Sequence, residues 1–143
     1  MKHELSFLTL ILLALLGAPR VILHDLHIIE EGTLVNLFFV FIPPMIWLFI
    51  ILRTSPSLFK PLFQIGLIYG VILALIHQLL WNIGFETPPQ LEGPLSALPT
   101  VVQNSLMRFA AFLSSIATGV AIGLIMGGAG WMIGQIKNRS VPQ

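Results

Sequence analysis

The sequence contains no cysteine in its 143 residues. This absence excludes a disulfide framework, a thiolate metal site, an iron–sulfur cluster and a thiol redox couple. Charge is also scarce, because Asp, Glu, Lys and Arg make up 9% of the chain, whereas soluble domains average about 25%. Seven Lys and Arg with six Asp and Glu cannot cover a water-facing exterior. Most side chains must therefore face lipid or other helices.

The net charge of +1 is small, and the basic residues are scattered along the chain. A nucleic-acid surface would show clustered Lys and Arg, so we expect no nucleic-acid partner. The sequence also lacks a nucleophile elbow, a phosphate-binding loop and a zinc-protease helix. These absences favour a binding or structural role over an enzymatic one.

Long apolar runs dominate what is present. Four of them approach or exceed the roughly 20 residues that cross a bilayer. The runs cover approximately residues 5–23, 33–52, 61–83 and 105–134. They predict an all-α integral membrane four-helix bundle that forms a single transmembrane domain over 1–143. The first run resembles a signal peptide, but we expect it to be an uncleaved helix.

Prolines punctuate these runs. Pro19, Pro43 and Pro44 lie inside predicted helices and should kink them, because each removes a backbone hydrogen bond. Pro61 suits the first turn of the third helix, where its missing N–H would be unpaired anyway. Thr100 is the expected N-cap of a helix that leads into the fourth span.

Charge placement predicts the orientation in the membrane. Four crossings put one set of basic residues on the same side: Lys2, Arg53, Lys60, Lys137 and Arg139. The opposite side holds the acidic residues Asp25, Glu30, Glu31, Glu86 and Glu92. By the positive-inside rule both termini are cytoplasmic. Trp131 and Trp81, near opposite ends of their spans, fit the two aromatic belts.

Two segments, GAPRVILHDLH (17–27) and IYGVILALIHQLLW (68–81), resemble small four-helix membrane proteins of prokaryotes. The resemblance implies the cytoplasmic membrane of a bacterium or archaeon. It implies no activity, substrate or cofactor.

Polar residues inside the spans gather toward the predicted outer end. They are Arg20, His24, His27, Asn36, His77, Gln78, Asn82, Asn104 and Arg108. The cytoplasmic half is almost purely apolar. Spacings of three and four residues place Arg20, His24 and His27 on one face if the first helix continues past Leu23.

This asymmetry predicts an outward-facing polar pocket formed by Arg20, His24, His77 and Arg108, with Asp25 beside them. We expect it to bind a lipid headgroup or a small anionic ligand, with Arg20 as the fixed positive charge and His77 as a hydrogen-bonding or pH-dependent group.

The two arginines differ in direction. A helical Cα–Cβ bond leans toward the N-terminus, so Arg108 can extend outward to water, whereas Arg20 leans into the bilayer. A charge left there costs about 2.5 to 3.5 kcal/mol on insertion scales, which predicts a partner or a water-filled cavity. The candidate carboxylate partners are Asp25, Glu31, Glu86 and Glu92.

Metal or haem binding is the minor hypothesis. His24, His27 and His77 offer imidazoles, and a spacing of three residues can place two histidines on one ion. Interfacial or hydrogen-bonding roles explain the same residues, and no motif supports a metal or haem site. We therefore favour no cofactor.

Glycines form the most specific local pattern. Gly119, Gly123 and Gly127 make a doubled GxxxG, and Gly66 with Gly70 makes a shorter copy. Such a glycine zipper lets helix backbones approach closely. We expect it to support a homo-oligomer, with packing inside one four-helix subunit as the alternative. A structural or accessory subunit of a membrane complex or transporter is the second functional hypothesis.

Overall fold

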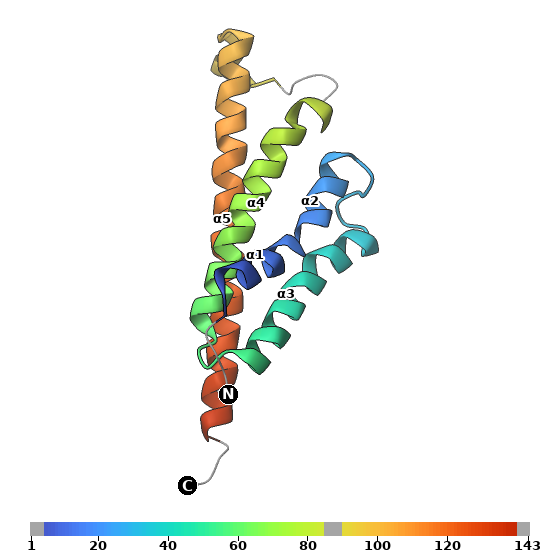
Figure 1. The fold of residues 1–143 in the computed structure, drawn as a ribbon. Coiled ribbons are helices and arrows are strands. Elements are labelled where there is room, and N and C mark those ends of the chain that lie inside the picture. The colour runs from blue at the N-terminus through green and yellow to red at the C-terminus, as the bar shows by residue number, and fades with distance from the viewer. Residues whose placement is uncertain (1–4, 85–89, 140–143) are drawn as a thin grey trace.

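The computed structural model describes residues 5–84 and 90–139. Every regular element in these ranges is helical. The elements are α1 (Phe7–Leu15), α2 (Ala18–Asp25), α3 (Leu34–Thr54), α4 (Phe59–Gly84), the short 3₁₀ helix η1 (Gly93–Ala97) and α5 (Thr100–Arg139). Taking α1 and α2 together, four helical segments are long and apolar enough to cross a membrane. The chain is thus a small polytopic membrane protein (Figure 1).

The first span is not one helix. It breaks between Leu15 and Ala18, where the amides of Leu16 and Gly17 bond to carbonyls only three residues back. Pro19 lies in the first turn of α2, where its missing N–H costs no helical bond. The expectation of an interruption at Pro19 is confirmed, but the continuous helix over 5–23 is wrong. A side chain at Gly17 would collide with the ring of Tyr69 on α4, so this bend needs glycine.

The second span, α3, begins where Thr33 accepts a hydrogen bond from the amide of Asn36. The helix continues without interruption through Pro43 and Pro44. One turn after the prolines, the fully buried Trp47 donates from Nε1 to the carbonyl of Leu13 at 2.7 Å. Since Leu13 lies in the last turn of α1, this bond gives a buried carbonyl a second donor and joins α1 to α3.

The largest interface joins α4 to α5 and is built on glycine. A Cβ at Gly70 would lie 3.0 Å from the Cα of Gly119, and one at Gly123 would lie 2.9 Å from the carbonyl oxygen of Phe63. Gly66 faces Gly119 and Gly123 in the same way. The two backbones are therefore in contact, as small-residue stripes allow. Because this glycine stripe is buried within the chain, it gives no support to self-association, which stays a prediction.

Helix α5 is much longer than the predicted range of 105–134. Its 40 residues span about 60 Å, twice the thickness of the hydrocarbon core, and it extends beyond α4 at both ends (Figure 1). Thr100 is its first helical residue and not its N-cap. The carbonyl of Pro99 instead accepts from the amides of Val102 and Gln103. Pro61 lies in the first turn of α4, as predicted.

The two ends of the molecule differ in charge. The end of α3, the start of α4 and the end of α5 lie toward one end and carry Arg53, Lys60 and Lys137. The connections 26–33 and 90–99 lie toward the other end and carry Glu31 and Glu92 (Figure 1). Lys2 and Glu86 lie outside the described residues. Which end faces the cytoplasm stays a prediction.

Substitution of Gly119 by Ala should weaken the α4–α5 contact, because the added methyl group overlaps the backbone of Gly66 and Gly70. We expect a loss of about 1–3 kcal/mol in the free energy of unfolding, as for other overpacked interiors. The measurement is reversible unfolding in detergent micelles.

Gly128→Ala, on the same helix, is the matched control. A Cβ at Gly128 would have no neighbouring atom within 4 Å. It should be neutral, or stabilising by up to about 1 kcal/mol through helix propensity. Equal effects of the two substitutions would contradict the packing argument.

Candidate functional site

A cavity of about 380 Å³ lies between α2, α4 and α5. Helix α2 and the residues after it contribute Arg20, His24, Asp25 and His27; α4 contributes His77 and Trp81; α5 contributes Ser114, Ser115 and Thr118. Four of the five residues predicted for the polar pocket thus share one cavity. Its other walls are apolar side chains and backbone, including Leu73 and Leu80.

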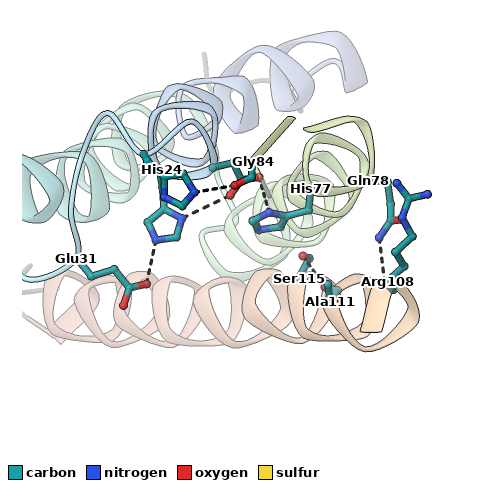
Figure 2. A network of polar contacts seen from close by, with 10 residues as sticks. His24, Glu31, His77, Gln78, Gly84, Arg108, Ala111 and Ser115 are labelled. Carbon is teal, nitrogen blue, oxygen red and sulfur yellow. Dashed lines mark hydrogen bonds and ion pairs between the residues drawn. The ribbon is translucent and has the colours of Figure 1, made fainter. Parts of the chain in front are cut away.

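Asp25, the last residue of α2, contacts two histidines. Figure 2 shows these two, His24 and His77, within the polar network. Its Oδ2 lies 2.6 Å from Nδ1 of His77 on α4, and its Oδ1 lies 3.4 Å from Nδ1 of His24. The Asp25 side chain is 12% exposed. Because a carboxylate only accepts hydrogen bonds, His77 donates through Nδ1–H. The bond ties the end of α2 to the side of α4.

His24 lies between two carboxylates. Its Nε2 is 3.1 Å from Oε1 of Glu31, a side chain that is 77% exposed in the connection to α3. A neutral imidazole can donate to Asp25 or to Glu31, whereas an imidazolium donates to both. His24 thus links the end of α2 to the connection before α3.

His27 has a structural contact. Its backbone is left-handed, with φ of 56°, and its Nε2 donates to the carbonyl of Gly84 at 2.7 Å. Gly84 ends α4, so His27 satisfies one of the carbonyls that a helix terminus leaves unpaired. A side chain at Gly84 would collide with the carbonyl of Asp25, which lies 2.6 Å from the Cβ position.

These contacts separate the three histidines of the metal hypothesis. His24 and His77 both bond to Asp25, while His27 bonds to backbone. Within 5–84 and 90–139, no three His, Asp or Glu side chains are arranged to hold a metal ion. The described residues give that hypothesis no support.

Arg20 has an unexpected partner. Its Nε donates to Oδ1 of Asn36 at 3.1 Å, and Asn36 is buried at the start of α3. The guanidinium also lies near the hydroxyl of Tyr69 on α4.

The sequence predicted either a partner for Arg20 or a water-filled cavity. None of the described candidates Asp25, Glu31 and Glu92 forms an ion pair with Arg20, which lines the cavity instead. Asp25 and Glu31 are bonded to other groups, since His24 and His77 contact Asp25, and His24 contacts Glu31 as well. Glu86, the fourth candidate, lies outside the described residues.

Arg108 lies outside the cavity. Its guanidinium is 5.6 Å from the ring centroid of Trp81, and its Nη2 is 3.5 Å from Oδ1 of Asn82. Trp81 lines the cavity, whereas Arg108 does not. The outward lean of a side chain near the start of α5, noted from the sequence, carries the guanidinium away from the pocket.

Three hydroxyl side chains of α5 line the cavity and were not predicted as part of the site: Ser114, Ser115 and Thr118. Ser115 donates to the carbonyl of Ala111 at 2.8 Å, and Thr118 donates to that of Ser114 at 2.9 Å. Their oxygen lone pairs remain as acceptors beside the cavity. The spacing of four residues between Ser114 and Thr118 places both hydroxyls on one face of α5 and could have indicated this part of the site. The glycines on the same helix form a stronger pattern.

Asp25 and His77 should be energetically coupled, because one hydrogen bond of 2.6 Å joins them across two helices. In a double-mutant cycle with Asp25→Ala and His77→Ala, we expect a coupling energy of about 0.5–3 kcal/mol in the free energy of unfolding. The matched cycle of Asp25→Ala with Arg108→Ala should be additive to within about 0.5 kcal/mol. Additivity in both cycles would argue against the network.

Comparison with known proteins assigns no family: no protein-family model, no curated protein sequence and no solved structure matches the chain.

Proposed function

We propose that the protein binds a phosphate-type oxyanion in the cavity, either the headgroup of an anionic phospholipid or a small free anion. The observation that carries this proposal is the state of Arg20, which lines the cavity and whose hydrogen-bond partner is a neutral amide. A guanidinium without a bonded carboxylate keeps its charge available, and its planar fork matches phosphate oxygens.

The neighbouring groups support this assignment. His24 lines the same cavity, where its two ring nitrogens contact Asp25 and Glu31 and so occupy carboxylate oxygens that would otherwise face an anion. The negative charge of Asp25 opposes an anion, but its two oxygens are engaged by His77 and His24. These bonds direct Asp25 toward the imidazoles and leave Arg20 as the cation that an incoming anion meets.

The shape of the cavity favours a phospholipid as the source of the anion. Helices α2 and α5 both line the cavity but make few direct contacts with each other. A cavity between two loosely apposed membrane helices is accessible from the surrounding lipid. Exposed apolar side chains on both helices, such as Ile22 and Leu113, would adjoin the acyl chains.

The site belongs to the outer leaflet in this proposal. Both termini would lie in the cytoplasm of a prokaryote, with the protein in its cytoplasmic membrane. The basic residues Arg53, Lys60 and Lys137 at the end opposite the cavity support this orientation under the positive-inside rule.

Arg20→Gln should weaken binding at least tenfold, equivalent to about 1.4 kcal/mol, because the amide keeps a donor for Asn36 but removes the charge. The measurement is the rise in Tm of the purified protein on titration with phosphatidylglycerol, with phosphatidylcholine, or with inorganic phosphate in detergent. The control variant is Arg108→Gln, which should bind as the wild type does.

The titrations separate the two sources. Stabilisation by phosphatidylglycerol alone assigns the site to a lipid headgroup, and equal stabilisation by inorganic phosphate assigns it to a free anion. A rise in Tm that is the same for phosphatidylcholine, or that survives in Arg20→Gln, would refute anion binding at Arg20.

A structural or accessory role is the second candidate, favoured by α5. This helix packs mainly on α4 and leaves more of its surface uncovered than any other span. We propose that the uncovered side contacts a second copy of the chain or another membrane protein.

The cysteine-free sequence makes a direct test possible. Single cysteines placed along the exposed side of α5, for example at Phe109, Leu113 and Ile125, should form disulfide-linked dimers in membranes with a period of three to four residues. Uniform, weak crosslinking along the helix would indicate random collision and contradict self-association.

A further inference from the structure

The paired prolines of α3 disturb the hydrogen bonding of two backbone carbonyls. Pro43 and Pro44 have no N–H, so the carbonyls of Phe39 and Val40 lose their donors four residues ahead. Val40 also loses the donor three residues ahead, because that position is Pro43. Within 5–84 and 90–137, no side chain donates a hydrogen bond to either carbonyl. Unpaired carbonyls inside a membrane protein are costly unless another group donates to them.

A second, smaller cavity lies at this point. It has a volume of about 40 Å³, and both Phe39 and Val40 line it. Arg20 and Thr118 line this inner cavity and the larger outer one. The two cavities are therefore neighbours that share a polar boundary.

The inner cavity has the polarity and the size to hold water. A single water needs about 10–15 Å³ of such volume and two to four polar partners. Arg20 supplies N–H donors, while Thr118 supplies an acceptor, because its own hydrogen is bonded to Ser114. Val40 lines the same cavity, and its backbone carbonyl lacks the amide donors of residues 43 and 44.

The inner cavity borders the apolar core of the protein. Trp47 lines it, and Trp47, Ile51, Leu62 and Ile65 are all fully buried. These side chains form one core cluster with Tyr69 and Leu73. The inner cavity therefore lies at the boundary between the polar residues Arg20 and Thr118 and the apolar core.

We propose that water fills the inner cavity and bridges Arg20 and Thr118 to the proline-freed carbonyl of Val40, as an extension of the outer cavity. This water compensates the carbonyl for its missing amide donors. It also hydrates Arg20 from the inner side, which stabilises a charge that has no bonded carboxylate. The inference holds whether or not an anion binds on the outer side.

The sequence permits a direct test by solid-state NMR. Val40–Phe41 is the only Val–Phe pair in the chain, so labelling valine with carbonyl ¹³C and phenylalanine with ¹⁵N isolates the Val40 carbonyl. Transfer of magnetisation from water protons to this carbon is then measured in phosphatidylcholine membranes without added anion. Trp47–Leu48 is likewise the only Trp–Leu pair. It provides a control carbonyl on the same helix inside the apolar core.

We expect transfer to Val40 to be several-fold faster than transfer to Trp47. Pro44→Ala restores an amide donor to Val40 and should slow the transfer toward the Trp47 rate. Transfer to Val40 as slow as to Trp47 in the wild type would overturn the proposal, as would fast transfer that Pro44→Ala leaves unchanged.

The anion titrations test the proposed function, and the NMR experiment tests the hydration of Val40. Either proposal can therefore be contradicted while the other stands. A wild type that binds no anion but shows fast transfer to Val40 overturns only the proposed function. A wild type that binds anion while the Val40 carbonyl is dry overturns only the hydration.

Discussion

The close approach of α4 and α5 is the contact on which the rest of the structure depends. Inside a bilayer, apolar side chains gain little by leaving lipid for protein, so helices associate through tight packing and hydrogen bonds. Gly66, Gly70, Gly119 and Gly123 let the two backbones touch. The resulting helix pair is the surface against which the shorter elements pack, and α1 and α2 both contact α4.

The break of the first span creates the polar site. A straight helix over 5–23 would have passed α4 along one line, but the bend at Gly17 gives α2 its own direction. Asp25 at the end of α2 then meets His77, and His27 meets the last carbonyl of α4. Each bond satisfies a polar group at a helix end, so the same contacts fix α2 and form one wall of the cavity.

Polarity in this molecule is graded with depth. The outer cavity contains charged and titratable groups, the inner one is lined by Arg20 and Thr118 together with apolar residues, and the buried side chains clustered with Trp47 are mainly apolar. A charge such as Arg20 is tolerated at the middle level because polar groups surround it from α3 and α4. A bound phosphate oxyanion in the outer cavity would complete the same compensation from the open side.

The sequence by itself determined that the chain lies in a membrane and that its fold is all-α. A 9% content of charged residues and four long apolar runs require helices that cross a bilayer, because no other single-chain arrangement satisfies the backbone there with such runs. The same patterns grouped the polar residues and the glycines by helix face, since helical periodicity is a local property. Tertiary structure alone decided which groups pair. Arg20 bonds to Asn36 and not to an acid, Arg108 leaves the pocket, and the glycines are buried inside the chain. The choice among partners depends on helix bends and on competition for each carboxylate, which involve residues far apart in sequence.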